Sequence, residues 1–503
     1  MNVDLTFQEK KMAYLRRMLC QIAAQEETAE TIIPDSMPDV GRIVGCWGVP
    51  VLRGKEWRSD GMLASGGITA KVLYVPADDG QPQVLESYLP FTMKWDFPMT
   101  DREGKLRVDC RLRSLDARMI NSRKILLRAN LAAKGEAYLP EEETFYTLQN
   151  PPKNVEVDVR HYPMILPVDC CEKSFLLDEE LDLPGTAPEI AKVVYYNVQP
   201  ELTDSKVMGS KAVFKGFAAL HLLYLAPDGR LATWEYEIPF SQYAELEQEF
   251  EREEELQIGL MSTGVELDAD EEGKRVRLKC SLLAQCLIST CQDVEVVQDA
   301  YSLRNALETK SKAVELESRL DRQQFQQVMR QNVPISGTVA DASILPDYPR
   351  QERSGDTVRL EVPVSGTVVY YDDTGALQGK TVHGQANCEM KLSDTGKCYA
   401  DSASAGRVQC SAAGGNGELQ ASILVTADCC AGQGMETLCG ITLGDALPRQ
   451  GQRPSVIVRK APRTESLWNL AKTCGSTREA IQGANAMTED HVEAGTLVLI
   501  PTL

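Results

Sequence analysis

The chain contains no long hydrophobic run. Nothing in its 503 residues approaches the ~18–20 continuous apolar residues that a membrane-spanning helix needs. The first residues also lack the uninterrupted apolar core of a secretion signal, because Lys10, Lys11, Arg16 and Arg17 break every candidate run. We therefore expect a protein that is neither inserted in a membrane nor exported, and that is made and kept in the cytosol.

Sequence motifs of common enzyme and metal sites are also missing. The chain has no GxxxxGK[ST] phosphate loop, no HExxH and no G-x-S-x-G. Its histidines are His161, His221, His383 and His491, and their wide separation in the sequence argues against a metal site or a catalytic triad. We expect a protein that is not an enzyme, with no catalytic residues, no metal ligands and no cofactor.

The 15 cysteines include no CxxC pair and no Cys/His spacing typical of a zinc site. They are scattered, apart from the vicinal pairs Cys170-Cys171 and Cys429-Cys430. In a reducing cytosol we expect most of them to be free thiols that pack like small apolar side chains. The alternative is oxidative cross-linking later, in an extracellular assembly.

Basic residues are fewer than acidic residues in this chain. The chain has 53 Lys and Arg residues against 73 Asp and Glu, which gives a net charge of -20. Such a charge repels phosphate backbones and anionic lipid, so we expect neither nucleic acid nor acidic membrane surfaces as direct partners. A basic protein partner is compatible with it. The acidic stretch from Glu245 to Glu255 is either a solvated strand edge or a docking site for such a partner.

The chain does contain one stretch that occurs three times. Each copy is a strand-like run that carries a tyrosine and leads into an acidic turn with glycine, which is a strong hairpin signal. The tyrosines are Tyr74, Tyr224 and Tyr370, and they are 150 and then 146 residues apart. Solenoid repeats are only about 20–50 residues long, so this spacing indicates duplicated whole domains. The three stretches are Val72–Gly80, Leu222–Gly229 and Val368–Gly375.

The first two copies align over a longer range. Ile33–Val40 matches Leu183–Ile190 at an offset of 150, and Gly66 matches Gly216 at the same offset. The third copy is more degraded. We expect the three tyrosines to be half-buried strand residues. The paired acids Asp78-Asp79 and Asp372-Asp373 should serve their turns and not calcium binding or acid-base chemistry.

These observations predict a mainly β fold of three tandem β-sandwich-like repeats with a small C-terminal βααβ module. The antiparallel strands follow from segments in which apolar and polar residues alternate. Those segments are Ile68–Tyr74, Leu106–Leu112, Ile125–Leu131 and Arg275–Leu282. The predicted divisions are an amphipathic helix at 1–30, repeats at 31–167, 168–307 and 308–444, a linker at 445–454 and the module at 455–503.

Two of these regions carry helical spacing. Leu15, Met18, Leu19 and Ile22 predict the N-terminal helix, and Leu316–Gln331 predicts a helix at the start of the third repeat.

The last fifty residues predict the order strand, helix, helix, strand. Val456–Val458 is the first strand, and a short helix over Leu467–Ala471 begins after an N-cap at Thr464 or Ser466. Ser476–Glu479 reads as a capping box that opens the second helix, and Thr496–Pro501 is the closing strand.

This order resembles the LysM module, a small βααβ glycan-binding fold. The resemblance implies a sugar groove between two loops, although the family's usual Gly-Asp before the helix is Thr464-Glu465 here. We expect Trp468 in the core and not against a sugar, because it lies in an apolar helical run. The resemblance is carried by Ser466-Leu467-Trp468, Leu470-Ala471, Ala480-Ile481, Asn485 and Gly495–Pro501. The implied groove residues are Thr464, Glu465 and Ser466 on one wall and Thr488, Glu489, Asp490 and His491 on the other.

The whole chain, with its Glu27–Asp35 leading motif, three β repeats and terminal module, resembles the SPOCS-domain spore coat morphogenetic proteins of the SipL and SpoVID type. The resemblance implies a scaffold made in the mother-cell cytosol that assembles at the forespore surface. There it would bind the coat's basement-layer morphogenetic ATPase or another coat protein, and the LysM module can serve as the docking element. The alternative is a protein that binds peptidoglycan or cortex glycan containing N-acetylglucosamine through the same module.

Overall fold

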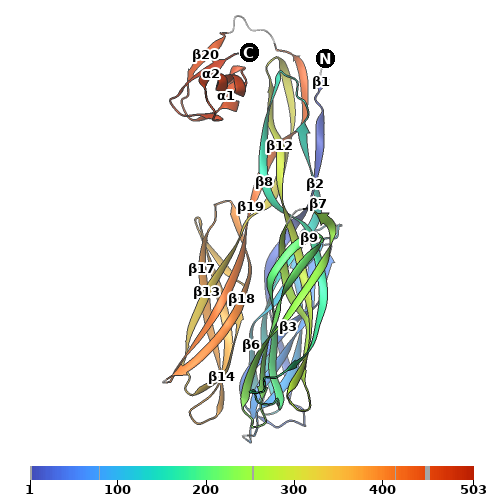
Figure 1. Cartoon of the computed structure of the whole chain (residues 1–503), viewed down its shortest axis with the longest axis vertical. Helices are drawn as coiled ribbons and strands as arrows, with labels where there is room; N and C mark the ends of the chain where they lie inside the picture. The colour runs from blue at the N-terminus through green and yellow to red at the C-terminus, as the bar shows by residue number, and fades with distance from the viewer. Residues whose placement is uncertain (1–2, 79, 252–253, 414, 448–453, 503) are drawn as a thin grey trace.

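A computed structural model describes residues 3–78, 80–251, 254–413, 415–447 and 454–502 of the chain, and these are mainly β, as predicted. The described part forms an elongated molecule with a narrow stem at one end and three lobes at the other (Figure 1). A small C-terminal domain lies beside the stem. No helix in these ranges is long and apolar enough to span a bilayer. The predicted linker at 445–454 falls mostly outside them.

The first lobe is a pair of antiparallel sheets around one apolar core. One sheet has the order β2-β7-β6 and the other the order β3-β4-β5. Side chains from both sheets meet in the core, among them Met62, Leu89 and Leu127, which are at most 1% exposed. The strands are β2 (Phe7–Ile32), β3 (Val40–Arg58), β4 (Gly61–Pro76), β5 (Gln83–Asp96), β6 (Lys105–Asn121) and β7 (Lys124–Leu148).

The second lobe repeats this plan with fewer strands. Strands β9 and β10 form one sheet, and they face β8, β12 and β11, which are neighbours in a larger sheet. The core includes Phe214, Leu222 and Ile288. The strands are β8 (Val155–Asp182), β9 (Lys192–Leu225), β10 (Leu231–Phe250), β11 (Glu255–Ala269) and β12 (Arg275–Ser302).

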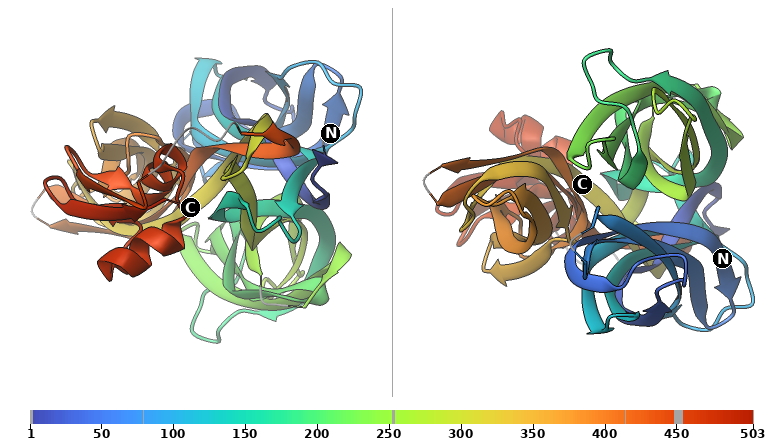
Figure 2. Two further views of the ribbon diagram at one scale, coloured as in Figure 1. Left: turned by 90° about the horizontal axis from the view of Figure 1, so that it is seen from above. Right: turned by 90° about the horizontal axis from the view of Figure 1, so that it is seen from below.

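The third lobe sets β14, β15, β16 and β17 against β13, β19 and β18. Its core includes Leu360, Val368 and Ile423. The strands are β13 (Asn305–Val333), β14 (Thr338–Pro346), β15 (Arg350–Ser354), β16 (Thr357–Tyr371), β17 (Leu377–Lys391), β18 (Gly396–Ala413) and β19 (Asn416–Ala446), and the short β1 (Val3–Asp4) pairs with the end of β19. Seen end-on, the lobes lie around a common axis (Figure 2).

The first and last strands of each lobe extend beyond the lobe, and these extensions form the stem. The paired ends of β2/β7, β8/β12 and β13/β19 continue beyond the lobes as three ribbons. Their apolar side chains form a separate core to which each ribbon contributes. The members include Met12 and Phe145 from the first ribbon, Met164 and Val296 from the second, and Val314 and Met435 from the third.

A β-bulge marks the point where each ribbon leaves its lobe. The ladder register shifts around Met18 in β2, around Val168 in β8 and around Leu320 in β13. A bulge adds one residue to one strand, bends it and increases the local twist. The bulges therefore let one continuous strand serve both a lobe and the stem.

The predicted N-terminal helix at 1–30 is wrong, because Phe7–Ile32 is the strand β2, paired with β7 along its length. The apolar spacing arises because this strand crosses three environments. Met12 lies in the stem core, Leu15 packs between the first two lobes, and Met18 and Leu19 pack on the first lobe's core. The segment is thus an integral strand of the first lobe and not a separate leading element.

The helix predicted at Leu316–Gln331 is wrong for the same reason. These residues belong to β13, in which Leu316 lies in the stem core while Phe325 and Met329 lie in the third lobe. The boundaries predicted at 167/168 and 307/308 fall inside β8 and β13. The strands predicted from alternation all lie within β4, β6, β7 and β12 and are confirmed.

The three recurring stretches form hairpins, β4-β5, β9-β10 and β16-β17. Asp78 and Asp372 act on the backbone of their turns, as predicted, whereas Asp79 lies outside the described residues. The Asp78 carboxylate accepts from the amide of Gly80 at 3.2 Å, and that of Asp372 accepts from the amide of Thr374 at 2.9 Å. Tyr74 and Tyr224 are fully buried and not half-buried as predicted, whereas Tyr370 is only partly buried.

Candidate functional site

The C-terminal domain contains two short helices between paired strands. Strands β20 (Val456–Lys460) and β23 (Leu497–Pro501) form one ribbon, and β21 (Glu465–Ser466) pairs with β22 (His491–Val492). Helices α1 (Leu467–Cys474) and α2 (Arg478–Asn485) lie between them in the chain. The core of the domain includes Leu467, Leu470, Ile481, Val498 and Ile500.

Capping explains where the helices begin. The Ser466 hydroxyl accepts from the amide of Asn469 at 3.3 Å, so Ser466 is the N-cap of α1, as one of the two predicted alternatives had it. The capping box predicted at Ser476–Glu479 is wrong, because the N-cap lies one residue later and places Ala480, not a glutamate, at the third helical position. Thr477 is the N-cap of α2, and its hydroxyl accepts from the amide of Ala480 at 3.1 Å.

The structure brings together the two walls of the predicted groove. Ser466 pairs with His491 across the β21/β22 ladder, and the amide of Leu467 donates to the carbonyl oxygen of Asp490 at 2.9 Å. At the rim, the Thr464 hydroxyl donates to the Glu493 carboxylate at 3.2 Å.

The acids of these loops have partners. Glu465 pairs with Arg459 at 3.1 Å, and the imidazole of His491 lies 3.6 Å from a carboxylate oxygen of Glu489. Thr464, Thr488, Glu489, Asp490 and His491 are exposed, whereas Glu465 and Ser466 are half-buried. The loops therefore offer hydroxyl and carboxylate groups for hydrogen bonding on a surface strip, with Ser466 also committed to its cap.

Trp468 is buried, as predicted, and it joins the C-terminal domain to the stem. Its indole nitrogen donates to the Asp299 carboxylate at 2.8 Å. Its ring packs edge-on against the ring of Tyr301, with the ring centroids 4.8 Å apart. Lys472 forms a 2.7 Å ion pair with the same carboxylate. Burial raises the pKa of Asp299, but the hydrogen bonds from Lys472 and Trp468 outweigh that effect, so its pKa lies below the usual range.

Two further contacts complete this docking surface. The Tyr301 hydroxyl donates to the carbonyl oxygen of Ser476 at 2.8 Å. The Arg478 guanidinium lies 3.3 Å from the buried Asp158 carboxylate and 3.6 Å from that of Asp490. Sequence reasoning missed Asp299, Tyr301 and Asp158, because nothing in their local sequence relates β8 and β12 to a segment more than a hundred residues away.

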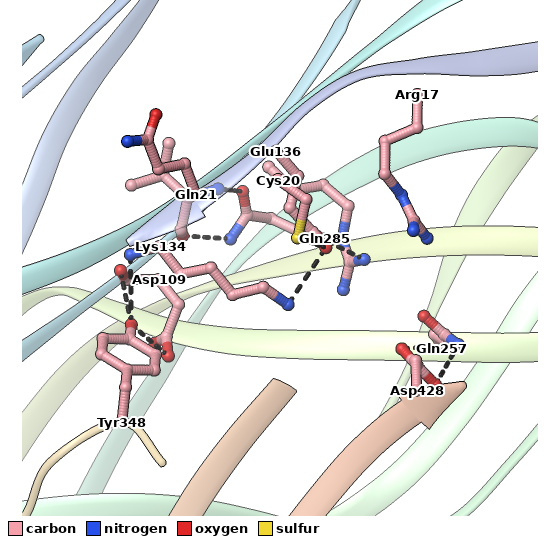
Figure 3. A network of polar contacts seen from close by, with 12 residues as sticks. Arg17, Cys20, Gln21, Asp109, Lys134, Glu136, Gln257, Gln285, Tyr348 and Asp428 are labelled. Carbon is pink, nitrogen blue, oxygen red and sulfur yellow. Dashed lines mark hydrogen bonds and ion pairs between the residues drawn. The ribbon is translucent and has the colours of Figure 1, made fainter. Parts of the chain in front are cut away.

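A second group of polar side chains lies where the three lobes meet, close to the stem. Buried polar contacts tie each pair of lobes (Figure 3). Gln285 of the second lobe exchanges hydrogen bonds with the backbone of Val108 in the first, at 2.7 and 2.9 Å. The Tyr348 hydroxyl of the third lobe donates to the Asp109 carboxylate of the first at 2.7 Å. Gln257 of the second lobe donates to Asp428 of the third at 3.3 Å.

A cavity of about 550 Å³ lies between the lobes, and residues of all three line it. Trp47 and Tyr195 stack on its wall with their ring centroids 5.5 Å apart. His221 also lines it and lies 3.0 Å from the buried carboxylate of Asp341, so this pair bridges the second and third lobes. Burial would lower the pKa of His221, but Asp341 and Glu235 raise it to about 9.

Equivalent positions also meet in an apolar cluster beside the cavity. Leu73, Leu223 and Val369 each precede the tyrosine of a recurring stretch, and all three lie in this one cluster. The three lobes are therefore held together by matching faces as well as by the stem.

No curated protein and no solved structure matches the chain. One family model does match: its description is SipL, SPOCS domain, and it covers residues 189–260. The matched segment contains β9 and β10, with the second of the recurring hairpins, and the start of β11. This segment of the chain is similar to a SPOCS domain.

Proposed function

We propose that the chain is a non-enzymatic scaffold of spore coat assembly. The SPOCS match to residues 189–260 supports a role related to the spore coat. The three lobes, each with its own core, and the stem that their own strands build around a further core are suited to holding partners apart at fixed positions. The mother-cell location at the forespore surface belongs to the same proposal.

The proposal includes the three lobes as copies of one SPOCS-like module. Three observations support it. The recurring hairpin lies at the same place in each lobe, a bulge marks each passage from lobe to stem, and Leu73, Leu223 and Val369 meet in one cluster. The family match covers only part of the second lobe, and the sequence of the third lobe is the most degraded of the three copies.

The C-terminal domain is, on this proposal, a LysM-like module that docks a coat protein such as the basement-layer ATPase. The observation that carries this choice is the outer face of the β20/β23 ribbon. Val458 and Leu499 are direct cross-strand partners on this face and are 58% and 39% exposed, and Val456 and Leu497 flank them at 47% and 63%. An apolar strip of this kind favours a protein surface over a hydrated sugar.

Binding of N-acetylglucosamine-containing glycan is the second candidate. It rests on the LysM resemblance and on the exposed hydroxyl and carboxylate groups of the strip from Thr464 to His491. Trp468 could not stack on a sugar in this arrangement, because its ring is buried against Tyr301. The two candidates therefore use different faces of one module.

Paired substitutions separate the two faces. We expect the double variant Val458→Glu and Leu499→Glu to abolish capture of the coat ATPase from a lysate of a sporulating endospore former, with the full chain as bait. The variant Thr464→Ala with Asp490→Asn should still capture it, and Lys460→Gln controls for charge on the same ribbon. If the ribbon variant captures the ATPase as the native chain does, while the loop variant loses binding to purified sacculi, the module is a glycan binder.

Localisation tests the role as a whole. A fluorescently tagged chain should form a ring around the forespore during sporulation. An even distribution in vegetative cells would contradict a coat scaffold.

A further inference from the structure

Two cysteines of the second lobe stand directly opposite each other. Cys171 in β8 and Cys286 in β12 are cross-strand partners in an antiparallel ladder whose register is unbroken from Arg275 to Ile288 of β12. Opposite residues of such a ladder have Cα atoms about 4.5–5.5 Å apart, inside the range of about 4.4–6.8 Å that a disulfide requires. Their side chains also project from the same face of the sheet.

The same geometry excludes Cys170, the vicinal neighbour of Cys171, as the partner of Cys286. Successive strand residues point to opposite faces, so Cys170 and Cys171 diverge. Cys170 lies with Leu15, Tyr138 and Leu287 between the first two lobes, whereas Cys171 packs toward the core of the second lobe. Each half of the vicinal pair therefore has a different environment.

Access distinguishes Cys171 from the other thiols that face a cysteine. Cys398 and Cys429 are also cross-strand partners, but they are 9% and 1% exposed inside the third lobe's core. Cys171 is half-buried, so a small reagent can reach it, while its cross-strand partner Cys286 is fully buried. An attack that begins at Cys171 can thus finish at Cys286.

We propose that Cys171 and Cys286 form a cross-strand disulfide when the chain meets a low-molecular-weight disulfide oxidant. The Cys171 thiolate attacks one sulfur of the oxidant and expels one thiolate, which leaves a mixed disulfide. Cys286 then loses its proton and attacks the Cys171 sulfur, and a second thiolate leaves. Two protein thiols are oxidised to one disulfide, and the oxidant is reduced to two thiols.

The raised pKa of Cys171 predicts how the rate of this reaction depends on pH. Hydrogen bonding to the Cys286 thiol, together with burial, raises the pKa of Cys171 far above that of an ordinary thiol. Because the thiolate is the attacking species, oxidation should be slow at neutral pH and should accelerate as the pH rises. The bond would staple β8 to β12, the two strands that carry the second lobe into the stem. The inference holds whether or not the proposed coat function is correct.

The test uses the full reduced chain and glutathione disulfide, followed by alkylation, proteolysis and mass spectrometry. Cys291 is the internal control, because it is exposed in the same strand β12 but stands opposite Ile165. We expect Cys291 to carry glutathione and Cys171 to be joined to Cys286. The joined chain should also need more urea to unfold than the reduced chain.

Two variants make the assignment specific. Cys171→Ser removes the reachable thiol at a half-buried position, and it should abolish both the linked peptide and the gain in urea resistance. In Cys286→Ala, which adds no polar group to the core, Cys171 should stop at the glutathione adduct. The proposal is overturned if Cys171 and Cys286 of the native chain are recovered as alkylated thiols or as glutathione adducts. The conditions must convert Cys291 fully and must extend to a pH equal to the ordinary thiol pKa of about 8.5.

Discussion

The hydroxyl of Tyr74 donates a hydrogen bond to the carbonyl oxygen of Pro38 at 3.0 Å. The same bond recurs in the second lobe, where Tyr224 donates to Pro188, again at 3.0 Å and again across 36 residues of chain. Both tyrosines are fully buried. Each bond satisfies a phenol that would otherwise be an unpaired polar group in a core, and each anchors the turn that leads into the next strand.

Removing these hydroxyls should therefore have matching effects. Tyr74→Phe and Tyr224→Phe each keep the ring but leave the proline carbonyl without its donor, and we expect each to lower the free energy of unfolding by about 1–2 kcal/mol. Urea titration followed by circular dichroism measures the loss. Tyr88→Phe is the control, since Tyr88 is 43% exposed, and it should change little. A difference of several-fold between the two core variants would contradict the equivalence of the two bonds.

Three glycines in the first strands of the recurring hairpins admit no side chain. A Cβ at Gly66 would clash with the carbonyl oxygen of Val51, one at Gly216 with that of Glu201, and one at Gly366 with that of Ser343. The first two lie eight residues before Tyr74 and Tyr224 and match in the sequence, whereas Gly366 lies four residues before Tyr370 and is not their counterpart.

Alanine at any of these glycines should cost stability, because a neighbouring backbone would have to move. We expect Gly66→Ala, Gly216→Ala and Gly366→Ala to lower the free energy of unfolding by about 1–3 kcal/mol each, as for other overpacked sites. Gly185→Ala is the matched control, since a Cβ there has open space. Urea midpoints of the three variants that equal that of the control would show that the strand pairs are looser than the structure has them.

The β character of the chain could be predicted because alternation is a local signal. Leu106–Leu112 and Arg275–Leu282 show one buried face and one wet face in the sequence, and the strands follow. The beginning of β2 could not be predicted in that way. Its apolar residues serve the stem, the lobe boundary and the lobe core in turn, so their spacing imitates a helix. Only the pairing with β7, more than a hundred residues away, determines their conformation.

In the candidate site too, features that depend on local sequence could be predicted, whereas contacts between distant segments could not. The burial of Trp468 was predicted from the apolar helical run around it, and Ser466 was one of the two N-caps predicted for α1. The partner of Trp468 was not, because Asp299 lies in another strand and in another part of the sequence. The pair of His221 and Asp341 was out of reach for the same reason, since it depends on how two lobes meet.

Asp299 should control the docking of the C-terminal domain on the stem. Asp299→Ala removes the acceptor of Trp468 and the counter-ion of Lys472, and we expect it to weaken the contact by about 1–3 kcal/mol. Hydrogen exchange read by mass spectrometry should show faster exchange in α1 and in the end of β12. Asp293→Ala is the control in the same strand, because Asp293 is exposed and pairs with the exposed His161.

The contact between the C-terminal domain and the stem should also weaken at low pH, when Asp299 becomes protonated. The folded-state pKa of Asp299 is lowered, so its contribution is present above the ordinary carboxyl pKa of about 3.9 and is lost as the pH falls through the lower folded value. Exchange in α1 should be equally slow, after correction for intrinsic rates, across neutral and mildly acidic pH. Loss of protection at mildly acidic pH would mean that another group governs the contact.

The ion pair of His221 and Asp341 predicts a response to base. Three strands converge on His221, which lies on β9: β14 brings Asp341, β10 brings Glu235, and Arg407 of β18 lies close enough to lower the pKa of Glu235. Tyr195 also faces Asp341, and burial followed by that negative charge raises its pKa. The histidine pKa rises from 6.5 to about 9. Because the folded value is the higher one, the pair contributes fully below the unfolded pKa and loses its contribution as the pH rises through the folded one.

The free energy of unfolding should therefore fall between about pH 6.5 and pH 9, by at most about 3 kcal/mol for a shift of this size. Urea titrations at a series of pH values measure the slope. In His221→Gln the slope over this window should flatten, because glutamine cannot gain a proton, and in His383→Gln, which changes an exposed histidine, it should persist. Equal slopes in the native chain and in His221→Gln would mean that the pair does not hold the second and third lobes together through its charge.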